Sequence, residues 1–500
     1  MMDKQLKEDF VSNLNGTSLV EIALGSLLAP LCVVSRGLVI ILCFLGGQAL
    51  PLSKKAHFLV DFMLIVIPLV MSCTVLSDML LMVILSFLVI NLSLFLQVYN
   101  KRRSFVQDRS LHILKVFLGG NLDSKVIPSV TAFRVFVNIK TAISILAVDF
   151  AVFPRRYAKT ESYGTGVMDF GVGAFVLANS LVSPESRQNN ISKSKLCHVT
   201  KQLLSVWPLV ALGMGRIISL KFVDYHEHVS EYGVHWNFFF TLAIVRVVAS
   251  SLLTFVPARK SWIFACIIGV FYQTILETTG LKSYILQGSD REEGFISANR
   301  EGLFSIFGYI TIYLAGVQIG LYIMEERKQV KDWIKTFFCL SLGCVGLFSI
   351  LFICQRFIEP VSRRTANLPF CIWILAQSLF FLCCLICMDL ILVFAKLISR
   401  CSHVPCSWTV RSITSRKNSI SSSSSDKTTL DKERCLIQSI NRNQLFYFLL
   451  SNVMTGLTNL TIDTLHQGAL VSICVLVVYM FVNCFTLYVL HLQEVSVKFW

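Results

Sequence analysis

Long apolar stretches alternate with short polar ones along the whole chain. A helix needs about 20 apolar residues to cross a hydrocarbon core roughly 30 Å thick. Thirteen stretches approach or exceed this length, at about 20–46, 57–75, 78–98, 132–149, 167–183, 202–221, 235–256, 261–277, 303–324, 336–355, 368–395, 444–460 and 469–491. They lack the alternation of a barrel strand, which leaves helices as the spanning structure. The pattern predicts an all-α polytopic membrane protein with about 13 transmembrane helices.

Composition supports this class. The 500 residues are 54% hydrophobic and 15% charged, whereas soluble domains are about 25% charged. We expect residues 1–500 to form a single membrane-embedded domain. Within it, residues 400–440 include a nearly all-serine run from Ser419 to Ser425, which predicts a disordered serine-rich loop.

The distribution of basic residues predicts the orientation. An outside N-terminus assigns 28 Lys and Arg to cytosolic segments, 11 to lumenal segments and 6 to the spans, as the positive-inside rule requires. With an odd number of spans, the N-terminus is then lumenal and the C-terminus cytosolic. Asn15-Gly16-Thr17 becomes a glycosylation sequon on the permitted side, at Asn15.

The net charge and the cysteines point to neither nucleic-acid binding nor a metal site. The net charge of +15 fits cytosolic loops facing anionic lipid, so no nucleic-acid partner is expected. The 17 cysteines show no metal-ligand spacing with a matching histidine pair, and we interpret them as small apolar packing residues. We predict no metal and no cofactor.

The predicted lumenal cations fall into clusters. They are Arg155, Arg156 and Lys159; Lys282, Arg291 and Arg300; Arg356, Arg363 and Arg364; and Lys4 and Lys7. Cations on the side that topology disfavours suggest phosphate binding, with Arg155 and Arg156 as first candidates. The alternative is a fringe that anchors the protein to lipid headgroups.

One stretch combines an acid with an amine. Asp149 ends the fourth predicted span, Pro154 breaks the helix, and Lys159 follows ten residues after Asp149. The two side chains could meet at the membrane boundary. There the carboxylate would act as a general base and the ammonium would stabilise an oxyanion. A structural ion pair between them is the alternative.

Further polar residues lie at the same predicted boundary. His235, Trp236 and Asn237 open the seventh span, where His235 could be catalytic or positioning. Asn299 and Arg300 open the ninth, where Arg300 could clamp a phosphate with Glu301 as its partner. Basic residues inside the spans must face the protein interior, a cavity or a headgroup; they include Arg36, Arg134, Lys140, Arg216 and Arg246.

Six segments carry a resemblance to a known family. They are LAVDFAVFPRRYAKTESYGTGVMDFGVG, SVWPLVALGMGR, EYGVHWNFFFTL, NREGLFSIFGY, VSRRTANLPFCIW and LSNVMTGLTNL. Together they resemble the PIG-W family of inositol acyltransferases in glycosylphosphatidylinositol (GPI) anchor synthesis, and its mammalian members in particular. The resemblance extends over essentially the full chain.

The resemblance implies an activity, a location and a site. It implies an enzyme of the endoplasmic reticulum membrane that moves a palmitoyl group from its co-substrate palmitoyl-CoA to the inositol 2-hydroxyl of glucosaminyl-phosphatidylinositol. It places Asp149 and Lys159 in the catalytic site, and we add Asp169 of the same block as a substrate-binding candidate. Direct attack of the hydroxyl is favoured, with an acyl-enzyme at Ser162 as the alternative.

Two other classes of protein fit the helix pattern. A secondary transporter would show matched repeats in its two halves, and no second copy of the FPRR segment occurs. A non-catalytic scaffold of lipid-glycan assembly would not need an acid and an amine together at the membrane boundary.

Sidedness tests the predicted topology. A tag inserted at Ser419–Ser425 should react with antibody once the plasma membrane alone is permeabilised, because this loop is predicted to be cytosolic. A tag beside Tyr163 should react only after the reticulum membrane is opened too. The reverse pattern would overturn the orientation.

Overall fold

The computed structural model describes residues 14–46, 54–103, 110–122, 126–187, 195–223, 231–288, 291, 294–401, 404–409 and 435–497. These residues form helices and loops, and the only β-pairing among them is two isolated bridges. The all-α fold is therefore confirmed. Lys4, Lys7 and the Ser419–Ser425 run lie outside the described residues, so the predicted loop disorder is not tested.

Nine helices in the described part of the chain are long and apolar enough to cross a membrane. They are α2 (Leu19–Leu45), α5 (Leu80–Arg103), α7 (Pro128–Ala147), α11 (Phe238–Phe255), α12 (Ser261–Thr278), α15 (Arg300–Met324), α16 (Val330–Phe357), α17 (Leu368–Ser399) and α22 (Ala469–Leu492). Each coincides with a predicted span, which confirms a polytopic membrane protein.

The other four predicted spans correspond to shorter or interrupted helices. They are the run α3 (Lys54–Asp61), η1 (Phe62–Val66) and α4 (Ile67–Ser72), then α8 (Val167–Ser180), α10 (Trp207–Val223) and α21 (Gln444–Thr461). The count of 13 spans and the orientation of the termini stay predictions. The remaining helices are short: α6 (Ser110–Leu118), η2 (Arg155–Tyr157), α9 (Lys195–Ser205), η3 (Ala258–Lys260), α13 (Leu281–Gln287), α14 (Phe295–Ala298) and α20 (Leu436–Arg442).

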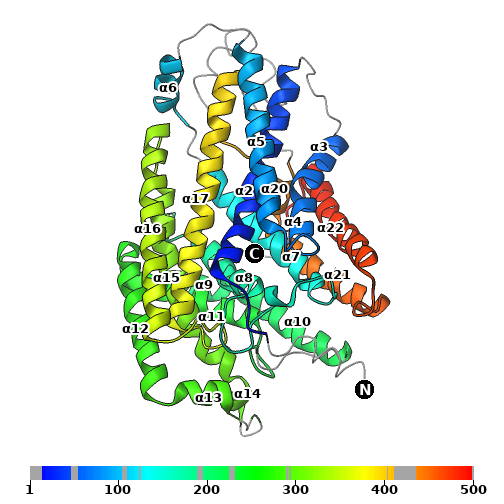
Figure 1. Cartoon of the computed structure of the whole chain (residues 1–500). Coiled ribbons are helices and arrows are strands. Elements are labelled where there is room, and N and C mark those ends of the chain that lie inside the picture. The colour runs from blue at the N-terminus through cyan, green and yellow to red at the C-terminus, as the bar shows by residue number, and fades with distance from the viewer. Residues whose placement is uncertain are drawn as a thin grey trace.

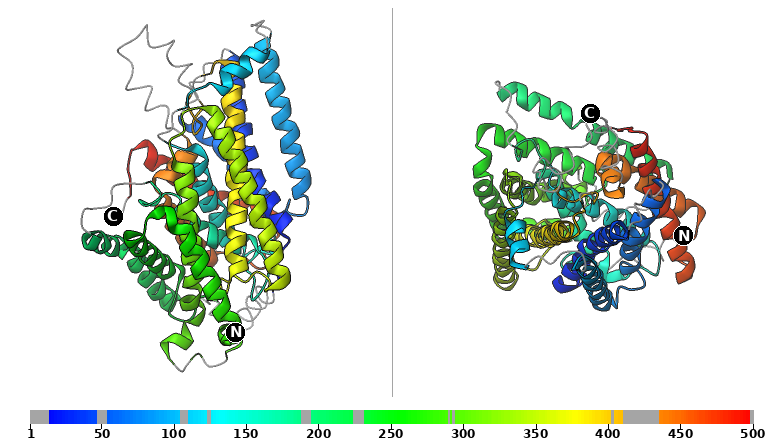
Figure 2. Two further views of the ribbon diagram at one scale, coloured as in Figure 1. Left: turned by 90° about the vertical axis from the view of Figure 1, so that its left-hand side faces the viewer. Right: turned by 90° about the horizontal axis from the view of Figure 1, so that it is seen from above.

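The long helices form one bundle around α17. This helix contacts α16, α2, α15, α7, α5 and α8, and Figure 1 shows it running the height of the molecule among them. Figure 2 shows the same bundle from the side and from above. Helices α13 and α14 lie at the lower end in Figure 1, which we call the loop end.

Local signals position the helices that reach the loop end. Asn367 caps α17 by accepting a hydrogen bond from the Phe370 backbone N–H, and a proline follows in the first turn, where its missing N–H costs nothing. Gly308 of α15 lies directly against Ala366, and a Cβ at residue 308 would overlap the Ala366 carbonyl. Small residues of this kind let membrane helices approach closely.

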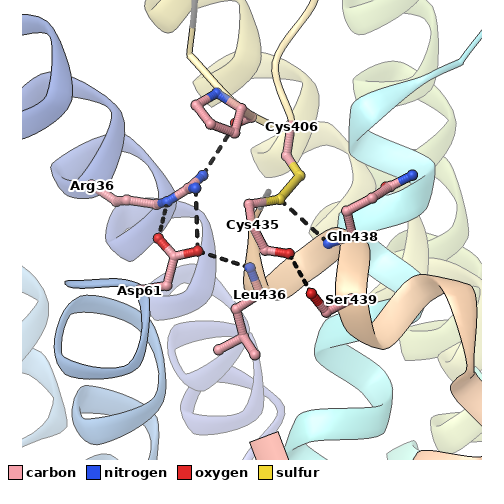
Figure 3. Close-up of a disulfide and its surroundings, with 8 residues drawn as sticks. Arg36, Asp61, Cys406, Cys435, Leu436, Gln438 and Ser439 are labelled. Atoms are coloured by element: carbon pink, nitrogen blue, oxygen red, sulfur yellow. Dashed lines mark hydrogen bonds and ion pairs between the residues drawn. A yellow bond between two sulfur atoms is a disulfide. The ribbon is translucent and has the colours of Figure 1, made fainter. Parts of the chain in front are cut away.

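A buried ion pair joins α2 to the end of α3 (Figure 3). Arg36 donates from Nε to Asp61 Oδ1 at 2.5 Å and from Nη1 to the Pro405 carbonyl at 3.1 Å. Asp61 Oδ2 also accepts from the Leu436 backbone N–H at 2.8 Å. Arg36 is 1% exposed, so of the three environments expected for a basic residue in a span, this arginine lies in the protein interior.

Two cysteines next to this ion pair depart from the packing role predicted for them. Cys406 and Cys435 form a disulfide, which closes the segment between them (Figure 3). The sequence interpretation was wrong here, because 29 residues separate the two cysteines and only the fold brings them together. Disulfides are rare in the reducing cytosol, so the sidedness experiment also tests whether this segment is cytosolic.

The Arg36–Asp61 pair should be essential for stability. Arg36→Met would leave the Asp61 carboxylate buried without its cation, and breaking such a pair costs about 3–5 kcal/mol. Denaturant unfolding of the detergent-solubilised protein should show this loss. The double variant Arg36→Met/Asp61→Leu should lose less, because no charge is stranded.

An ion pair with an exposed carboxylate provides the control. Glu325 is 66% exposed and pairs with Arg327 at 2.8 Å; Glu325→Gln should cost less than about 1 kcal/mol. Equal losses for Arg36→Met and Glu325→Gln would contradict the importance of burial.

Candidate functional site

Four loop segments meet at the loop end, and we call them the loop layer: residues 148–166, 231–237, 294–302 and 358–367. The Gly164 N–H donates to the Val361 carbonyl at 2.8 Å, and the Gly302 N–H donates to the Tyr232 carbonyl at 3.0 Å. Ser362 Oγ donates to the Ser162 carbonyl at 2.6 Å. Segments up to 200 residues apart in sequence therefore hold one polar surface together.

Asp149 follows the end of α7 and is held by a residue of a distant helix. Asn459 of α21 donates from Nδ2 to Asp149 Oδ2 at 2.8 Å. The Arg155 guanidinium lies close enough for its charge to interact with the Asp149 carboxylate.

Lys159 pairs with a glutamate that the sequence argument did not single out. Its ammonium lies 2.7 and 2.6 Å from the two carboxylate oxygens of Glu231. The proposed ion pair of Lys159 with Asp149 is thus replaced by one with Glu231. The available signal was the position of Glu231, which opens the EYGVHWN segment.

The Lys159–Glu231 pair is strongly ionic. Burial by itself raises the pKa of Glu231, but the neighbouring charges of Lys159 and Arg363 outweigh burial and lower that pKa to about 2. The carboxylate therefore stays charged near neutral pH, and it holds a cation at the loop layer.

Arg155 and Arg156 both have partners within the protein. Arg155 donates to the carbonyls of Val148, Phe150 and Phe153 at 2.9–3.2 Å, which satisfies carbonyls left free just past the end of α7. Burial lowers the pKa of Arg155 to about 10, against the opposing effect of the Asp149 charge. The predicted phosphate contact would have to compete with these bonds.

Arg156 joins the loop layer to the start of α2. Its guanidinium contacts Glu21 at 3.0 Å and Asp78 at 2.6 Å. Tyr157 adds a 2.7 Å hydrogen bond to Glu21. A structural role for Arg156 is thus evident, and its phosphate contact stays a prediction.

Asp169 is fully buried at the start of α8. It forms a 2.7 Å ion pair with Arg363, and it accepts from the Thr160 backbone N–H at 3.0 Å and from the Thr160 hydroxyl at 2.8 Å. These contacts indicate that Asp169 organises the loop layer. The predicted contact with substrate is not tested by them.

The three residues before α11 have different roles. Asn237 caps the helix, accepting from the Phe239 and Phe240 N–H groups at 3.1 and 3.3 Å. Trp236 is buried and donates to Thr241 Oγ1 at 3.0 Å. The His235 side chain is exposed and, of the three, is the one placed to reach a ligand.

Asn299 joins two parts of the loop layer. Its Oδ1 accepts from the His235 backbone N–H at 2.7 Å, and its Nδ2 donates to the Phe295 carbonyl at 2.9 Å. Gly233 has a φ of +115°, and a Cβ there would lie 2.5 Å from the Asn299 Cα. This close approach requires glycine, and Asn299 supports the loop layer; its contact with substrate stays a prediction.

Arg300 belongs to a cluster of arginines around a buried carboxylate. The carboxylate of Glu301, 0% exposed, is contacted by Arg291 at 2.8 Å, Arg364 at 2.9 Å and Arg300 at 3.7 Å. Arg300 also donates to the Gly288 carbonyl. Its Nε and Nη1 are buried and form no hydrogen bond with any residue that the structure describes. Buried guanidinium donors of this kind are suited to binding an anion.

Asn15 lies beside the loop layer and is exposed. Its sequon partner Thr17 donates its backbone N–H to the Thr165 carbonyl at 2.6 Å. Glycosylation of Asn15 stays a prediction. Among the described residues, no three His, Cys, Asp or Glu side chains gather so as to hold a metal ion.

Comparison with known proteins indicates the relationships of the chain. The GWT1 family profile matches residues 3–490. Glucosaminyl-phosphatidylinositol-acyltransferase PIGW of Bos taurus is 47% identical over 504 residues, and the human protein of that name is 45% identical over 505 residues; both alignments cover 100% of each chain. GPI-anchored wall transfer protein 1 of Saccharomyces cerevisiae is 32% identical over 510 residues, covering 95% of each chain.

The Glu231 carboxylate provides a pH test of the site. Its folded-state pKa of about 2 lies below the ordinary value of 4.5, so its contribution to stability is present above pH 4.5 and is lost as pH falls toward 2. The melting temperature of Glu231→Gln should therefore lie below wild type by a constant amount at neutral and mildly acidic pH. This difference should shrink below pH 4.5.

Glu161 offers a matched control because it is exposed in the same loop layer. Glu161→Gln should melt close to wild type at every pH. A Glu231→Gln defect that grows on acidification would contradict the assignment.

Proposed function

The chain belongs to the GWT1 family, and from this premise we propose that it is a membrane enzyme that transfers an acyl group to glucosaminyl-phosphatidylinositol in GPI-anchor synthesis. The observation that carries the proposal is full-length identity of 45–47% to three mammalian proteins named as acyltransferases of this glycolipid. The family resemblance recognised in the sequence is confirmed by these matches and by the family profile.

Three finer features belong to the proposal. The donor is palmitoyl-CoA, the acceptor is the inositol 2-hydroxyl, and the enzyme works in the endoplasmic reticulum membrane. They rest on the family motifs in the sequence. The apolar helices support a multi-pass membrane location.

The chemistry assigned to the loop layer is direct acyl transfer. The inositol hydroxyl oxygen attacks the thioester carbonyl, and its proton passes to the Asp149 carboxylate. The carbonyl then reforms, the carbon–sulfur bond breaks, and CoA leaves as a thiolate that takes up a proton. The Lys159 ammonium, held by Glu231 at 2.6 Å, stabilises the negative charge that develops on the carbonyl oxygen.

An acyl-enzyme at Ser162 has less support. A serine nucleophile needs a base within hydrogen-bond reach of its hydroxyl. In the described part of the chain, the bond recorded at Ser162 involves its backbone carbonyl, which accepts from Ser362. Direct attack therefore remains the favoured route.

The glycolipid phosphate is assigned to the arginine cluster around Glu301. Nε and Nη1 of Arg300 are buried and form no hydrogen bond with any residue that the structure describes. A phosphodiester would supply acceptors to these nitrogens. This assignment moves the main clamp from Arg155 and Arg156 to Arg300, with Arg364 beside it.

Activity of the purified protein tests the function. Radiolabelled palmitoyl-CoA and glucosaminyl-phosphatidylinositol should yield a labelled, alkali-labile inositol ester. Asp149→Asn and Lys159→Ala should each cut turnover by roughly 10²-fold or more, the usual contribution of a positioned acid–base group. The double variant should be little worse than the worse single, because the two groups serve one transition state.

The same experiment can reject the proposal. No transfer by well-folded wild-type protein would favour a transporter or a scaffold. Wild-type turnover per folded molecule in both single variants would show that these residues only stabilise the loop layer.

The phosphate assignment predicts a change in KM. Arg300→Ala should raise KM for the glycolipid more than for palmitoyl-CoA, and Arg300→Lys should restore binding only in part because lysine lacks the planar fork. Steady-state kinetics with each substrate varied in turn measure both values.

An exposed arginine of η3 serves as the control. Arg259→Ala should leave both KM values unchanged, since Arg259 is exposed and lies outside the loop layer. Equal KM changes for the two substrates in Arg300→Ala would contradict a phosphate contact.

A further inference from the structure

Helix α21 brings one side chain to the proposed catalytic base. Asn459 lies near the end of this helix and is 310 residues from Asp149 in sequence, yet its Nδ2 donates to Asp149 Oδ2 at 2.8 Å. Two other asparagines of the bundle use the amide nitrogen within their own helix. Asn452 and Asn483 donate to the carbonyl four residues earlier in their own helix. Asn459 uses its amide to contact another segment.

The position of Asn459 is determined by three packed helices. Helix α21 packs on α7, and α22 packs on both. The Tyr479 hydroxyl of α22 lies 3.1 Å from the Ala142 carbonyl of α7 and 3.1 Å from the Ser451 carbonyl of α21. The amide is therefore presented to Asp149 by rigid elements, which is how precise sites are built.

The amide oxygen of Asn459 differs from its nitrogen in its surroundings. Asn459 Oδ1 is buried and accepts no hydrogen bond from any residue that the structure describes. A buried acceptor without a partner is unfavourable and calls for an explanation. A ligand hydroxyl bound beside Asp149 would supply the missing donor.

We propose that Asn459 positions Asp149 through Nδ2 and binds, through Oδ1, a second hydroxyl of the acceptor ring. The inference rests on the proposed function, because Asp149 must be the base. An inositol ring carries hydroxyls on neighbouring carbons, so one can lose its proton to Asp149 while the next donates to Asn459. The pair Asp149 and Asn459 then recognises a vicinal diol.

The groups around Asp149 determine how its protonation, and with it the reaction rate, should depend on pH. The pKa of Arg155 responds to the Asp149 carboxylate, so the two charges lie close together, and Asn459 itself does not titrate. A hydrogen bond to a carboxylate favours its ionised form. Removing the Asn459 amide should therefore make Asp149 easier to protonate.

The test uses the full-length enzyme with variants of one helix. Asn459→Ala removes both contacts, Asn459→Asp keeps the shape but adds a negative charge, and Asn452→Ala is the matched control, since Asn452 is exposed on the same helix. Steady-state rates are measured across pH with two acceptors. One is glucosaminyl-phosphatidylinositol, and the other is its analogue lacking the ring hydroxyl next to the acceptor carbon on the side away from the phosphate.

The expected results follow from the two contacts. Asn459→Ala should lower kcat/KM for the natural acceptor by about 10- to 100-fold and move the acidic limb of the pH–rate profile to higher pH. Asn459→Asp should move it further, because a second carboxylate disfavours ionisation of the first. With the deoxy analogue, wild type should lose rate and Asn459→Ala should lose little more, since the hydroxyl and Oδ1 act as one pair.

Two outcomes distinguish a failure of this inference from a failure of the proposed function on which it rests. If Asp149→Asn is inactive while Asn459→Ala keeps the wild-type pH profile and acceptor preference, the role of Asn459 is overturned and the proposed base stands. If Asp149→Asn turns over normally, the base assignment fails and the inference fails with it. Should Asn459→Ala not fold, the isosteric Asn459→Asp supplies the pH readout, and the rate that wild type loses with the deoxy analogue tests the Oδ1 contact; no loss would overturn it.

Discussion

Charge buried among membrane helices has to be neutralised by the protein, because hydrocarbon does not hydrate ions. This constraint explains the strongest links in the fold. Arg36 and Asp61 join α2 to α3 with exposed fractions of 1% and 2% for their side chains, and the same aspartate holds the start of α20. Asp169 and Arg363 join α8 to the loop before α17 at 2.7 Å.

The loop layer holds two further groups of buried or half-buried charges. Lys159 has a carboxylate of its own in Glu231, so a cation is held at a defined place. Around Glu301, three arginines contact the same carboxylate. Two buried nitrogens of Arg300 form no hydrogen bond with any described residue, and an anion would supply their acceptors. An enzyme whose acceptor carries a phosphate has a use for both arrangements, one at the reacting carbonyl and one at the phosphodiester.

The residues around Asp149 show how the bundle supports chemistry in a loop. Arg155 binds the carbonyls that follow α7, which holds the backbone next to Asp149. Asn459 then orients the carboxylate from α21, and Tyr479 secures α21 to α7. The family motifs contain both Asp149 and Asn459, but nothing local to either one indicates that they touch.

The sequence by itself determined the fold class, nine of the spans, the family and the segments that form the loop layer. It could do so because long apolar runs have one stable form in lipid and because the polar motifs occupy the ends of those runs. Only the tertiary structure decided the partners: Glu231 for Lys159, backbone carbonyls for Arg155, and Cys435 for Cys406. The sequence did not reveal these partners because they lie far apart along the chain: 72 residues separate Lys159 from Glu231, and 310 separate Asp149 from Asn459. Whether two side chains form a hydrogen bond depends on the distance between their atoms. The packing of the helices determines that distance, and no local sequence pattern does.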